Sequence, residues 1–450
     1  MVMPKIRRNS INTSGNNSDA TDTLWDVAVI GGGPAGMMAA GRAAEGGARV
    51  ILIEKNDTLG KKLLITGGGR CNVTNAEMDN RKLLAKFNKK DTQNDKFLFS
   101  AFSQWSVKET LDFFHIKHMQ TKIEAEQRVF PVTDKAQSVW NILIEYVREQ
   151  NVTIRSNSPV TEFIVSEVSK HIPREIDIPL TITSVKVTGG QTIQAKSFIL
   201  ATGGKSRPET GSTGDGFVWL KQLGHTVVEP SASLVPLAIK DPWVKQLQGI
   251  TLPEVKITIL QNNEKQDIKK GKILFTHFGI SGPTVLNMSK DVSELLKYGD
   301  VDISLDTMPS FDHGTLNAKL QETFKKQSNK KIKNGLADIL PSALSPIILE
   351  KAAINADTFC HSITREERLR LITTLKDLRM SVKGLLGVDK AIVTSGGVDL
   401  SEVDFKTMRS RKVSNLHLVG DILNIDRPSG GFSLQLCWTT GYVAGASANK

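Results

Sequence analysis

The stretch "DVAVIGGGPAGMMAA" (residues 26–40) combines a short apolar run, a glycine turn and a run of small residues. The apolar run predicts a buried strand at 25–30, and the small residues predict a helix from about residue 35 to 45. "GGARVILIEK" (46–55) predicts a second buried strand that ends at Glu54. Strand, helix and strand together form one βαβ unit of about 30 residues.

The glycines of this unit follow the spacing Gly31-x-Gly33-x-x-Gly36, which is typical of a dinucleotide-binding turn. The first permits a tight turn, the second lets the backbone approach a pyrophosphate, and the third lets helix and strand pack closely. The helix N-terminus adds unpaired N–H groups and a partial positive charge. Glu54 lies 23 residues beyond Gly31, where a carboxylate accepts hydrogen bonds from ribose hydroxyls. The alternative for Glu54 is an ordinary strand-end carboxylate.

The composition is that of an ordinary globular protein with an excess of basic residues. The chain has 450 residues, which suggests two or three domains, and a net charge of +11. Nucleic acid is disfavoured as a partner, because the densest group of lysines, "KKQSNKKIKNG" (325–335), has no interleaved aromatic residues. The positive charge also suits anionic cofactors or substrates. No run of about 18 apolar residues is present, so the sequence predicts no membrane contact.

Cysteine usage indicates a reducing compartment. Cys71, Cys360 and Cys437 lie far apart and form no CxxC or zinc-like spacing. We therefore expect a cytoplasmic protein without a metal site. Residues 1–22 are rich in Ser, Asn and Thr, which predicts a disordered tail. A transit peptide is the alternative, because no acidic residue precedes Asp19.

The periodicity of the remaining chain indicates a nucleotide-binding domain that is interrupted by an insert. Residues 23–204 begin with the βαβ unit and end in a β-rich stretch, and residues 386–450 return to the same kind of strand and helix. Residues 205–385 form the insert, which is strand-like over 205–308 and helical over 309–385. We therefore expect a discontinuous nucleotide domain built from both ends of the chain.

Three further stretches supply additional cradles, which FAD needs because it is long and binds in an extended form. "GKKLLITGGGRCNVTN" (60–75) has a second glycine cluster, and "ATGG" (201–204) closes a buried strand. "LVGDILNIDRPSGGFSLQLCWTTGYVAG" (418–445) leads from a strand through a glycine turn into a helix. The start of that helix can direct N–H dipoles at the flavin N1/C2=O edge, where negative charge collects on reduction.

These stretches resemble the BaiN/YhiN-type flavoproteins, which include aminoacetone oxidases and are described as NAD(P)/FAD-dependent oxidoreductases. The resemblance covers residues 26–446 and is most specific in "GKKLLITGGGRCNVTN". "RVFPVTDKAQSV" (128–139), "FTHFGISGP" (275–283) and "VTSGGVDLSEVDFKTMRS" (393–410) also match. It implies an α/β fold: a Rossmann-like FAD domain of the two-dinucleotide-binding-domain type, with an inserted β-barrel plus helical subdomain.

The resemblance also implies which residues contact FAD. Those at the ADP half are Gly31, Gly33, Pro34, Ala35, Gly36 and Glu54; Val160 lies near adenine; Gly420 and Asp421 meet the ribityl and pyrophosphate region; Gly430, Gly431, Phe432, Ser433 and Leu434 lie under the isoalloxazine ring. Further candidate cofactor contacts are Lys55, Lys62, Arg70, Asn72, Thr202 and Gly203. The chain departs from the family at Gln127, where Gly is usual, at Asp421, where Glu is usual, and at Ser433, where Asn is usual. The last change affects redox tuning more than FAD binding.

Few side chains are obligatory for hydride transfer, because the cofactor carries that chemistry. His277 in "FTHFGISGP" is the candidate acid–base or substrate-orienting group, since a His titrates near the working pH. The alternative is a His that is hydrogen-bonded within the insert. Arg70 is a candidate for a cofactor phosphate or a substrate carboxylate, or for a structural bridge to a carboxylate such as Glu54. Cys71 and Cys437 are expected to pack as small apolar residues.

The sequence therefore predicts an FAD-dependent oxidoreductase with a non-covalent flavin. A hydride passes between a small organic substrate or NAD(P)H and flavin N5, and a second substrate or oxygen reoxidises the flavin. No second strand–GxGxxG–helix unit is present, so NAD(P)H would dock transiently. The alternative is a non-catalytic flavin-binding sensor or an RNA-associated flavoprotein, which the charge of +11 suggests. The substrate and the oligomeric state stay open.

Overall fold

The computed structural model describes residues 5–9, 23–87, 92–166, 180–387, 391 and 393–450. The chain divides into two compact units. The first combines Met1–Ala232 with Ile392–Lys450, and the second comprises Ser233–Ala391. The expected insert, 205–385, therefore starts too early, because α7 (Asp215–Gln222) and most of β11 (Val227–Ser233) belong to the first unit.

A sheet of eight strands, counted over the described residues, forms the centre of the first unit. Its order is β1-β8-β9-β10-β2-β3-β7, with β19 also paired to β10. Five strands run parallel to one another: β2 (Trp25–Ile30), β3 (Val50–Ile53), β7 (Thr153–Arg155), β10 (Thr192–Leu200) and β19 (Leu416–Leu418). All four residues of β3 are buried aliphatic side chains, as is typical of a parallel strand with both faces covered.

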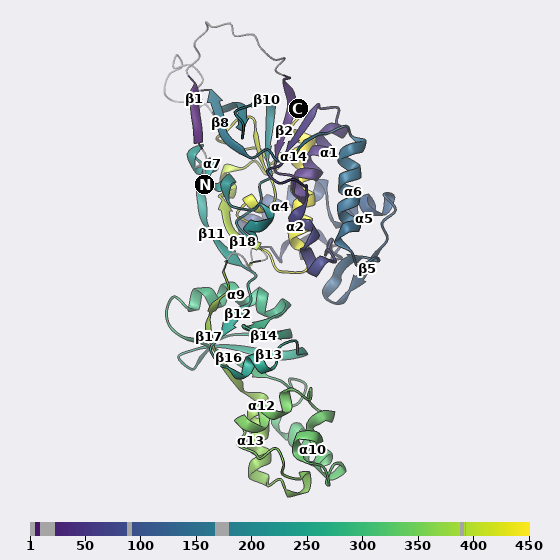
Figure 1. Ribbon diagram of the computed structural model, residues 1–450, viewed down its shortest axis with the longest axis vertical. Coiled ribbons are helices and arrows are strands. Elements are labelled where there is room, and N and C mark those ends of the chain that lie inside the picture. Colours follow the sequence, from purple (N-terminus) through teal and green to yellow (C-terminus); the bar gives the residue numbers. More distant parts are fainter. Residues whose placement is uncertain (1–4, 10–22, 88–91, 167–179, 388–390, 392) are drawn as a thin grey trace. The chain divides into compact units, whose positions relative to one another are not determined.

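Helix α1 (Pro34–Glu45) connects β2 to β3 and lies beside α14 (Phe432–Ser447), which comes from the other end of the chain (Figure 1). The two helices approach closely because α14 carries glycines at the contact. A Cβ on Gly441 would lie 2.5 Å from the carbonyl oxygen of Ala35, which is closer than real side chains come. Both ends of the chain thus contribute to one nucleotide-binding unit.

The remaining elements of the first unit surround this core. Strands β8 (Val160–Ser166) and β9 (Thr181–Val187) extend the main sheet, β4 (Thr74–Asn75), β6 (Arg128–Pro131) and β5 (Thr121–Glu124) form a small antiparallel sheet, and β11 pairs with β18 (Val393–Val398). The further helices are α2 (Lys61–Leu64), α3 (Asn80–Leu84), α4 (Thr92–Gln104), α5 (Val107–Ile116) and α6 (Ala136–Glu149). None of the helices described is long and apolar enough to span a bilayer.

Strand β1 (Lys5–Asn9) corrects one expectation. The sequence predicts disorder over residues 1–22, but residues 5–9 pair in parallel with Glu162–Ser166 of β8. A polar segment can form such a strand, because backbone hydrogen bonds hold it and they do not depend on apolar side chains. The other parts of the predicted tail, residues 1–4 and 10–22, lie outside the described residues.

The second unit contains a closed barrel whose described strands follow the order β12-β15-β14-β13-β16-β17. Their bounds are β12 (Leu237–Ile239), β13 (Thr251–Gln261), β14 (Glu264–Thr276), β15 (Gly279–Ser281), β16 (Val301–Asp306) and β17 (Leu378–Leu385). The helices are α8 (Trp243–Gln246), α9 (Pro283–Leu295), α10 (His313–Lys326), α11 (Ile332–Gly335), α12 (Leu344–Lys351) and α13 (Arg365–Lys376). The expected division at residue 308 is therefore wrong for β17, which completes the barrel after the helical part.

Candidate functional site

A cleft opens at the carboxyl ends of β2, β3 and β10, where open α/β sheets bind their ligands. It contains about 1250 Å³ of space free of protein atoms, counted with the part that is open to solvent. All of its lining residues belong to the first unit. They come from the glycine turn and α1, the end of β3, α2, residues 158–160, residues 201–219, Val393, residues 419–421 and the start of α14.

The glycine turn has three glycines with different roles. Gly31 adopts a φ of +103°, and a Cβ on it would lie 2.5 Å from the carbonyl oxygen of Ala201. A Cβ on Gly36 would lie 1.9 Å from the carbonyl oxygen of Gly31. A Cβ on Gly33 would meet nothing within 4 Å, and Gly33 lines the cleft. Side chains at Gly31 and Gly36 would clash with the protein backbone, whereas a side chain at Gly33 would occupy space that is open to a ligand.

Gly33 is also the N-cap residue of α1, and no side chain caps this helix end. The first N–H groups of a helix have no partner within the helix, so those of α1 are available to a ligand in the cleft. They carry the positive end of the helix dipole, which favours an anion. This is the position where a pyrophosphate fits.

Glu54 follows β3 and is 7% exposed. Its Oε2 accepts a hydrogen bond of 2.7 Å from the N–H of Gly32, and its Oε1 accepts two of 2.8 Å from the backbone and side chain of Asn56. A carboxylate has about four acceptor positions. Glu54 thus fixes the glycine turn and keeps capacity for a ligand hydroxyl in the cleft that it lines.

Lys55, the neighbouring candidate, points to the loop before α7. Its Nζ donates to Thr213 Oγ1 at 2.5 Å and to Asp215 Oδ2 at 2.8 Å. All three residues line the cleft. The ion pair therefore closes one side of the cleft with residues that sequence analysis did not select, because Asp215 lies 160 positions further along the chain.

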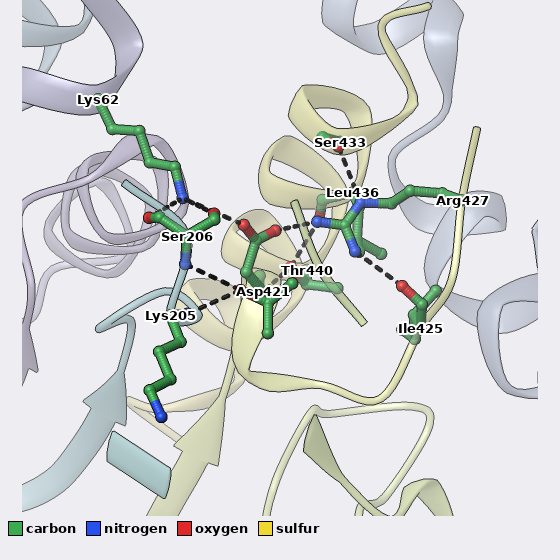
Figure 2. Close-up of polar contacts among 11 residues, drawn as sticks. Lys62, Lys205, Ser206, Asp421, Ile425, Arg427, Ser433, Leu436 and Thr440 are labelled. Atoms are coloured by element: carbon green, nitrogen blue, oxygen red, sulfur yellow. Dashed lines mark hydrogen bonds and ion pairs between the residues drawn. The ribbon is translucent and has the colours of Figure 1, made fainter. Parts of the chain in front are cut away.

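A cluster of charged residues forms another part of the wall (Figure 2). Lys62 Nζ donates to the carbonyl oxygen of Ser206 at 3.1 Å and to its Oγ at 2.7 Å, and lies 3.8 Å from Asp421 Oδ2. Arg427 forms an ion pair with Asp421 and donates to Ser433 Oγ at 2.9 Å. The Arg427 side chain is 1% exposed, so its charge is almost completely removed from water.

The cluster holds two cations and one carboxylate. The pKa of Lys62 is lowered from its usual value, mainly by burial and also by the guanidinium of Arg427, while the carboxylate of Asp421 opposes this shift. A buried charge is costly unless a partner compensates it. Lys62 and Asp421 both line the cleft, and an anionic ligand there would favour the charged form of Lys62, so two cations with one carboxylate are complementary to an anion.

The N-terminus of α14 faces the same cleft through Ser433 and Leu434. Gly431 precedes this helix with a φ of +98°, and a Cβ on it would lie 2.2 Å from the carbonyl carbon of Thr74. No side chain caps the helix, so its first N–H groups also remain available. A second positive helix end thus supplements that of α1.

These features fit FAD. Two uncapped helix N-termini, the excess positive charge and the Glu54 carboxylate match a dinucleotide with a pyrophosphate and ribose hydroxyls. Thr202 Oγ1 lines the cleft, is buried, and has no hydrogen-bond partner among the described residues, as expected for a group that contacts a ligand. The bound flavin supplies the hydride chemistry, while the protein binds and orients it.

Most of the candidate cofactor contacts lie in this cleft. Those that line it are Gly31, Gly33, Pro34, Ala35, Glu54, Lys55, Lys62, Val160, Thr202, Gly203, Gly420, Asp421, Ser433 and Leu434. Those that do not are Gly36, Arg70, Asn72, Gly430, Gly431 and Phe432. Gly36 instead packs on Gly31, and Gly431 packs on Thr74. The Asn72 Oδ1 atom is buried without a partner within the part of the chain described.

Arg70 requires a correction. Its guanidinium forms ion pairs with Glu124 and Asp134 and lies over the ring of Phe130, with Cζ 4.1 Å from the ring centroid. Arg70 does not line the cleft, and the structure instead shows the alternative, a structural bridge to carboxylates, with Glu124 and Asp134 in place of Glu54. Glu124 ends β5 and Asp134 lies in the turn after β6, and residue spacing alone does not show that both meet Arg70.

His277 occupies the turn between β14 and β15 in the second unit and is exposed. Its ring meets that of Phe278 edge-on, at 4.9 Å between centroids. It is not among the residues that line the cleft. Its acid–base or orienting role stays a prediction.

Two buried thiols lie near the cofactor cleft. Cys437 on α14 lines it, and burial raises the pKa of this thiol to about 12. Cys71 is fully buried, and burial raises its pKa to about 12 as well. Both groups therefore stay protonated near neutral pH, as small packing residues do.

A Ser–His–Glu arrangement lies elsewhere in the first unit. His225 Nδ1 is 3.0 Å from Glu402 Oε2, and His225 Nε2 is 2.9 Å from Ser410 Oγ. Such a geometry can activate a serine nucleophile. However, Ser410 is 4% exposed and its Oγ accepts the N–H groups of Lys412 and Val413. These bonds fix the turn at residues 410–413, so the cluster has a structural role.

Comparison with known proteins identifies the family. Residues 25–447 match the HI0933-like protein Rossmann domain, and the chain belongs to this family. It is 30% identical over 422 residues to a ribosomal RNA dihydrouridine synthase of Escherichia coli K12, covering 93% of this chain and 96% of the relative. It is 29% identical over 425 residues to a 3-dehydro-bile acid delta(4,6)-reductase of Clostridium scindens, covering 94% and 98%.

Among solved structures, a 3-ketosteroid-delta4-(5alpha)-dehydrogenase from Rhodococcus jostii matches with a TM-score of 0.52 at 13% identity, covering 95% of this chain and 97% of that one. At this identity the match shows the fold alone. With the family membership, the protein is an FAD-dependent oxidoreductase with a Rossmann-type α/β domain. The fold class, the family and the FAD cofactor that the sequence predicts are thereby confirmed, whereas NAD(P)H as electron donor stays a prediction.

Proposed function

We propose that this protein is a reductase that saturates a carbon–carbon double bond conjugated to a carbonyl group. Dihydrouridine is uridine whose C5–C6 double bond, next to a carbonyl in the ring system, has been reduced. A delta(4,6)-reductase likewise acts on double bonds. The observation that carries the proposal is that both relatives match almost the whole chain, cleft and second unit included.

The chemistry requires a hydride for the carbon remote from the carbonyl and a proton for the carbon beside it. FAD supplies the hydride through N5 when bound and reduced, and a reduced nicotinamide is the proposed donor of each new pair of electrons. The protein is proposed to hold the flavin non-covalently through the helix ends of α1 and α14. The excess positive charge around Lys62 stabilises negative charge in the cleft.

The proton requires a separate donor. Cys437 lines the cleft, but a thiol with a pKa raised to about 12 releases its proton poorly near neutral pH. His277 is the proposed donor or orienting group, because an imidazole can both donate and accept a hydrogen bond and is a common general acid. The His277→Ala variant should keep its FAD and lose turnover. The control is His313→Ala, a change at another exposed His of the second unit, which should keep both its FAD and its turnover.

A uracil ring in RNA is the first proposed substrate. The net charge of +11 suits a polyanion, and the E. coli relative is named for a ribosomal RNA product. The sequence analysis disfavours a nucleic-acid partner and keeps an RNA-associated flavoprotein as its alternative, so this proposal departs from the favoured expectation. The second candidate is a small cyclic enone, which the bile-acid reductase relative favours at nearly the same identity.

The test uses the purified yellow protein without oxygen. NADH and NADPH are added in turn, and bleaching of the flavin absorbance identifies the donor. The reduced protein is then given ribosomal RNA that lacks dihydrouridine, or a cyclic enone, and mass spectrometry follows a gain of two hydrogens. Reoxidation by one of these substrates supports the proposal. Reoxidation by oxygen alone, with an amine as the electron donor, would overturn it.

A further inference from the structure

The most family-specific stretch of the sequence, residues 60–75, contains a loop whose geometry suggests a mechanical role. Thr66–Gly69 form a short helical turn, here called the glycine arch, in which Gly67, Gly68 and Gly69 have φ values of +57°, +69° and +86°. All three glycines are exposed. A Cβ on Gly68 or Gly69 would meet nothing within 4 Å. The arch therefore has little packing of its own to hold it in place.

The arch is continuous with the wall of the cofactor cleft. Thr66 lines the cleft, as do Lys61, Lys62 and Leu63 of the preceding helix α2. Thr66 Oγ1 donates to the carbonyl oxygen of Leu63 at 2.6 Å, which links the arch to α2. A helix of this length has almost no stability of its own. The position of Lys62 thus depends on what fixes the arch as well as on the burial of Leu63 and on its own bonds to Ser206.

Arg70 directly follows the arch and fastens it to the β5–β6 hairpin. Its Nε donates to Asp134 Oδ1 at 2.8 Å and its Nη1 to Glu124 Oε2 at 3.2 Å. The same guanidinium lies over Phe130, and a Cβ on Gly67 would lie 3.3 Å from that ring. The planar fork of an arginine allows several such bonds at once, which a lysine cannot reproduce.

We infer that Arg70 is a positioning residue: it fastens the glycine arch to the β5–β6 hairpin and thereby holds α2, with Lys62, in the wall of the cofactor cleft. This inference rests on the cofactor assignment of the proposed function and is independent of the substrate. Arg70 acts through the arch and does not itself line the cleft. The inference gives Arg70 a structural role in place of the direct cofactor contact that the sequence predicts.

The test compares Arg70→Ala holoenzyme with the wild type in two ways. FAD release on dilution is followed by the fluorescence of free flavin, and hydrogen–deuterium exchange is followed on peptides that cover residues 60–72. We expect release to become about fivefold faster, the upper end of the range for solvated ion pairs because Arg70 has two carboxylate partners, and exchange in 60–72 to rise. Arg70→Lys should lie in between, because it keeps the charge and loses the fork.

A double substitution and a control make the test specific. Asp134→Asn should add little to Arg70→Ala if both act through one contact. Lys108→Ala breaks an exposed ion pair of 2.7 Å with Asp112 on α5, away from the arch, and should leave release and exchange unchanged.

Two outcomes would overturn the inference. One is a lower melting temperature of Arg70→Ala with wild-type FAD release and wild-type exchange in 60–72, which would make Arg70 a support of the hairpin alone. The other is an equal change in Lys108→Ala. A wild-type protein that takes up no FAD would instead refute the cofactor assignment, so the two failures are distinguishable.

Discussion

Replacing Asp421 by Asn tests the buried charge cluster that lines the cleft. The carboxylate stands between Lys62 Nζ, at 3.8 Å, and the guanidinium of Arg427. The Asp421 side chain is 13% exposed and that of Arg427 is 1% exposed. Without the carboxylate the guanidinium of Arg427 loses its ion-pair partner and cannot turn into water, and Lys62 loses the charge that raises its pKa.

The expected loss follows from this geometry. At 3.8 Å an ion pair gains about 4 kcal/mol at the effective dielectric constant typical of proteins, and desolvation offsets part of that gain. Breaking a buried pair by removing one partner costs about 3–5 kcal/mol. We expect the lower end, about 3 kcal/mol in the free energy of unfolding, because Asn keeps the volume and one hydrogen-bond acceptor.

Urea unfolding followed by tryptophan fluorescence measures this loss. Five of the six tryptophans lie in the first unit, so a Trp243→Phe background restricts the signal to that unit. The apoprotein of each variant is used, since bound FAD adds stability by mass action and Asp421 lines the FAD cleft. Asp421→Glu, which restores the charge, is the matched control and should cost little.

A double-mutant cycle identifies the cause. Adding Arg427→Met to Asp421→Asn removes the unpaired buried charge and should recover most of the loss. The reasoning is refuted if Asp421→Asn costs less than about 1 kcal/mol, the value of an ordinary surface pair. It is also refuted if Arg427→Met brings no recovery.

Three further predictions follow from burial and packing. Gly36→Ala places a Cβ 1.9 Å from a carbonyl oxygen, so the protein should accumulate without FAD, as the absorbance of the purified material will show. Burial lowers the pKa of His417 to about 4 from 6.5, so the stability it contributes is complete above pH 6.5 and falls by about 3 kcal/mol as the pH drops towards 4. His417→Gln should flatten that part of the stability profile measured by urea unfolding. Cys71 and Cys437, with pKa values raised to about 12, should resist iodoacetamide at pH 7.5 in the folded protein and react in urea; mass spectrometry that finds either labelled in the native state would contradict their burial.

The glycine turn and the return of the C-terminal helix to the first unit could be predicted because local spacing encodes them. Gly31 forms the tight turn and Gly36 the close packing that their spacing indicates, Gly33 opens onto the cleft, and Glu54 follows the second strand as expected. The turn before α14 was also visible, since Gly431 adopts the positive φ that a glycine pair suggests. Such features depend on a few neighbouring residues.

The partners of charged residues could not be predicted, because tertiary structure sets them. Arg70 finds Glu124, 54 positions away in β5, and Asp134, 64 positions away in the turn after β6. Lys55 finds Asp215 160 positions away. No local sequence pattern determines which residues so far apart in the chain form an ion pair.

The limits of the second unit were missed for a similar reason. Strand β17 pairs with both β12 and β16, which precede the helical part of that unit. A barrel strand separated from its neighbours by helices has no local signal that reveals its partners.

The most direct test of the account is FAD binding by Gly33→Ala. A Cβ at this position meets no protein atom within 4 Å, and the φ of −77° suits alanine. The apoprotein should therefore keep the wild-type unfolding free energy to within about 1 kcal/mol. We predict that the wild type binds one FAD per chain and releases it on denaturation. The methyl group of Gly33→Ala should weaken FAD binding at least about tenfold, which corresponds to about 1.4 kcal/mol. A colourless wild type that refuses FAD, or a variant that binds it equally tightly, would contradict the account.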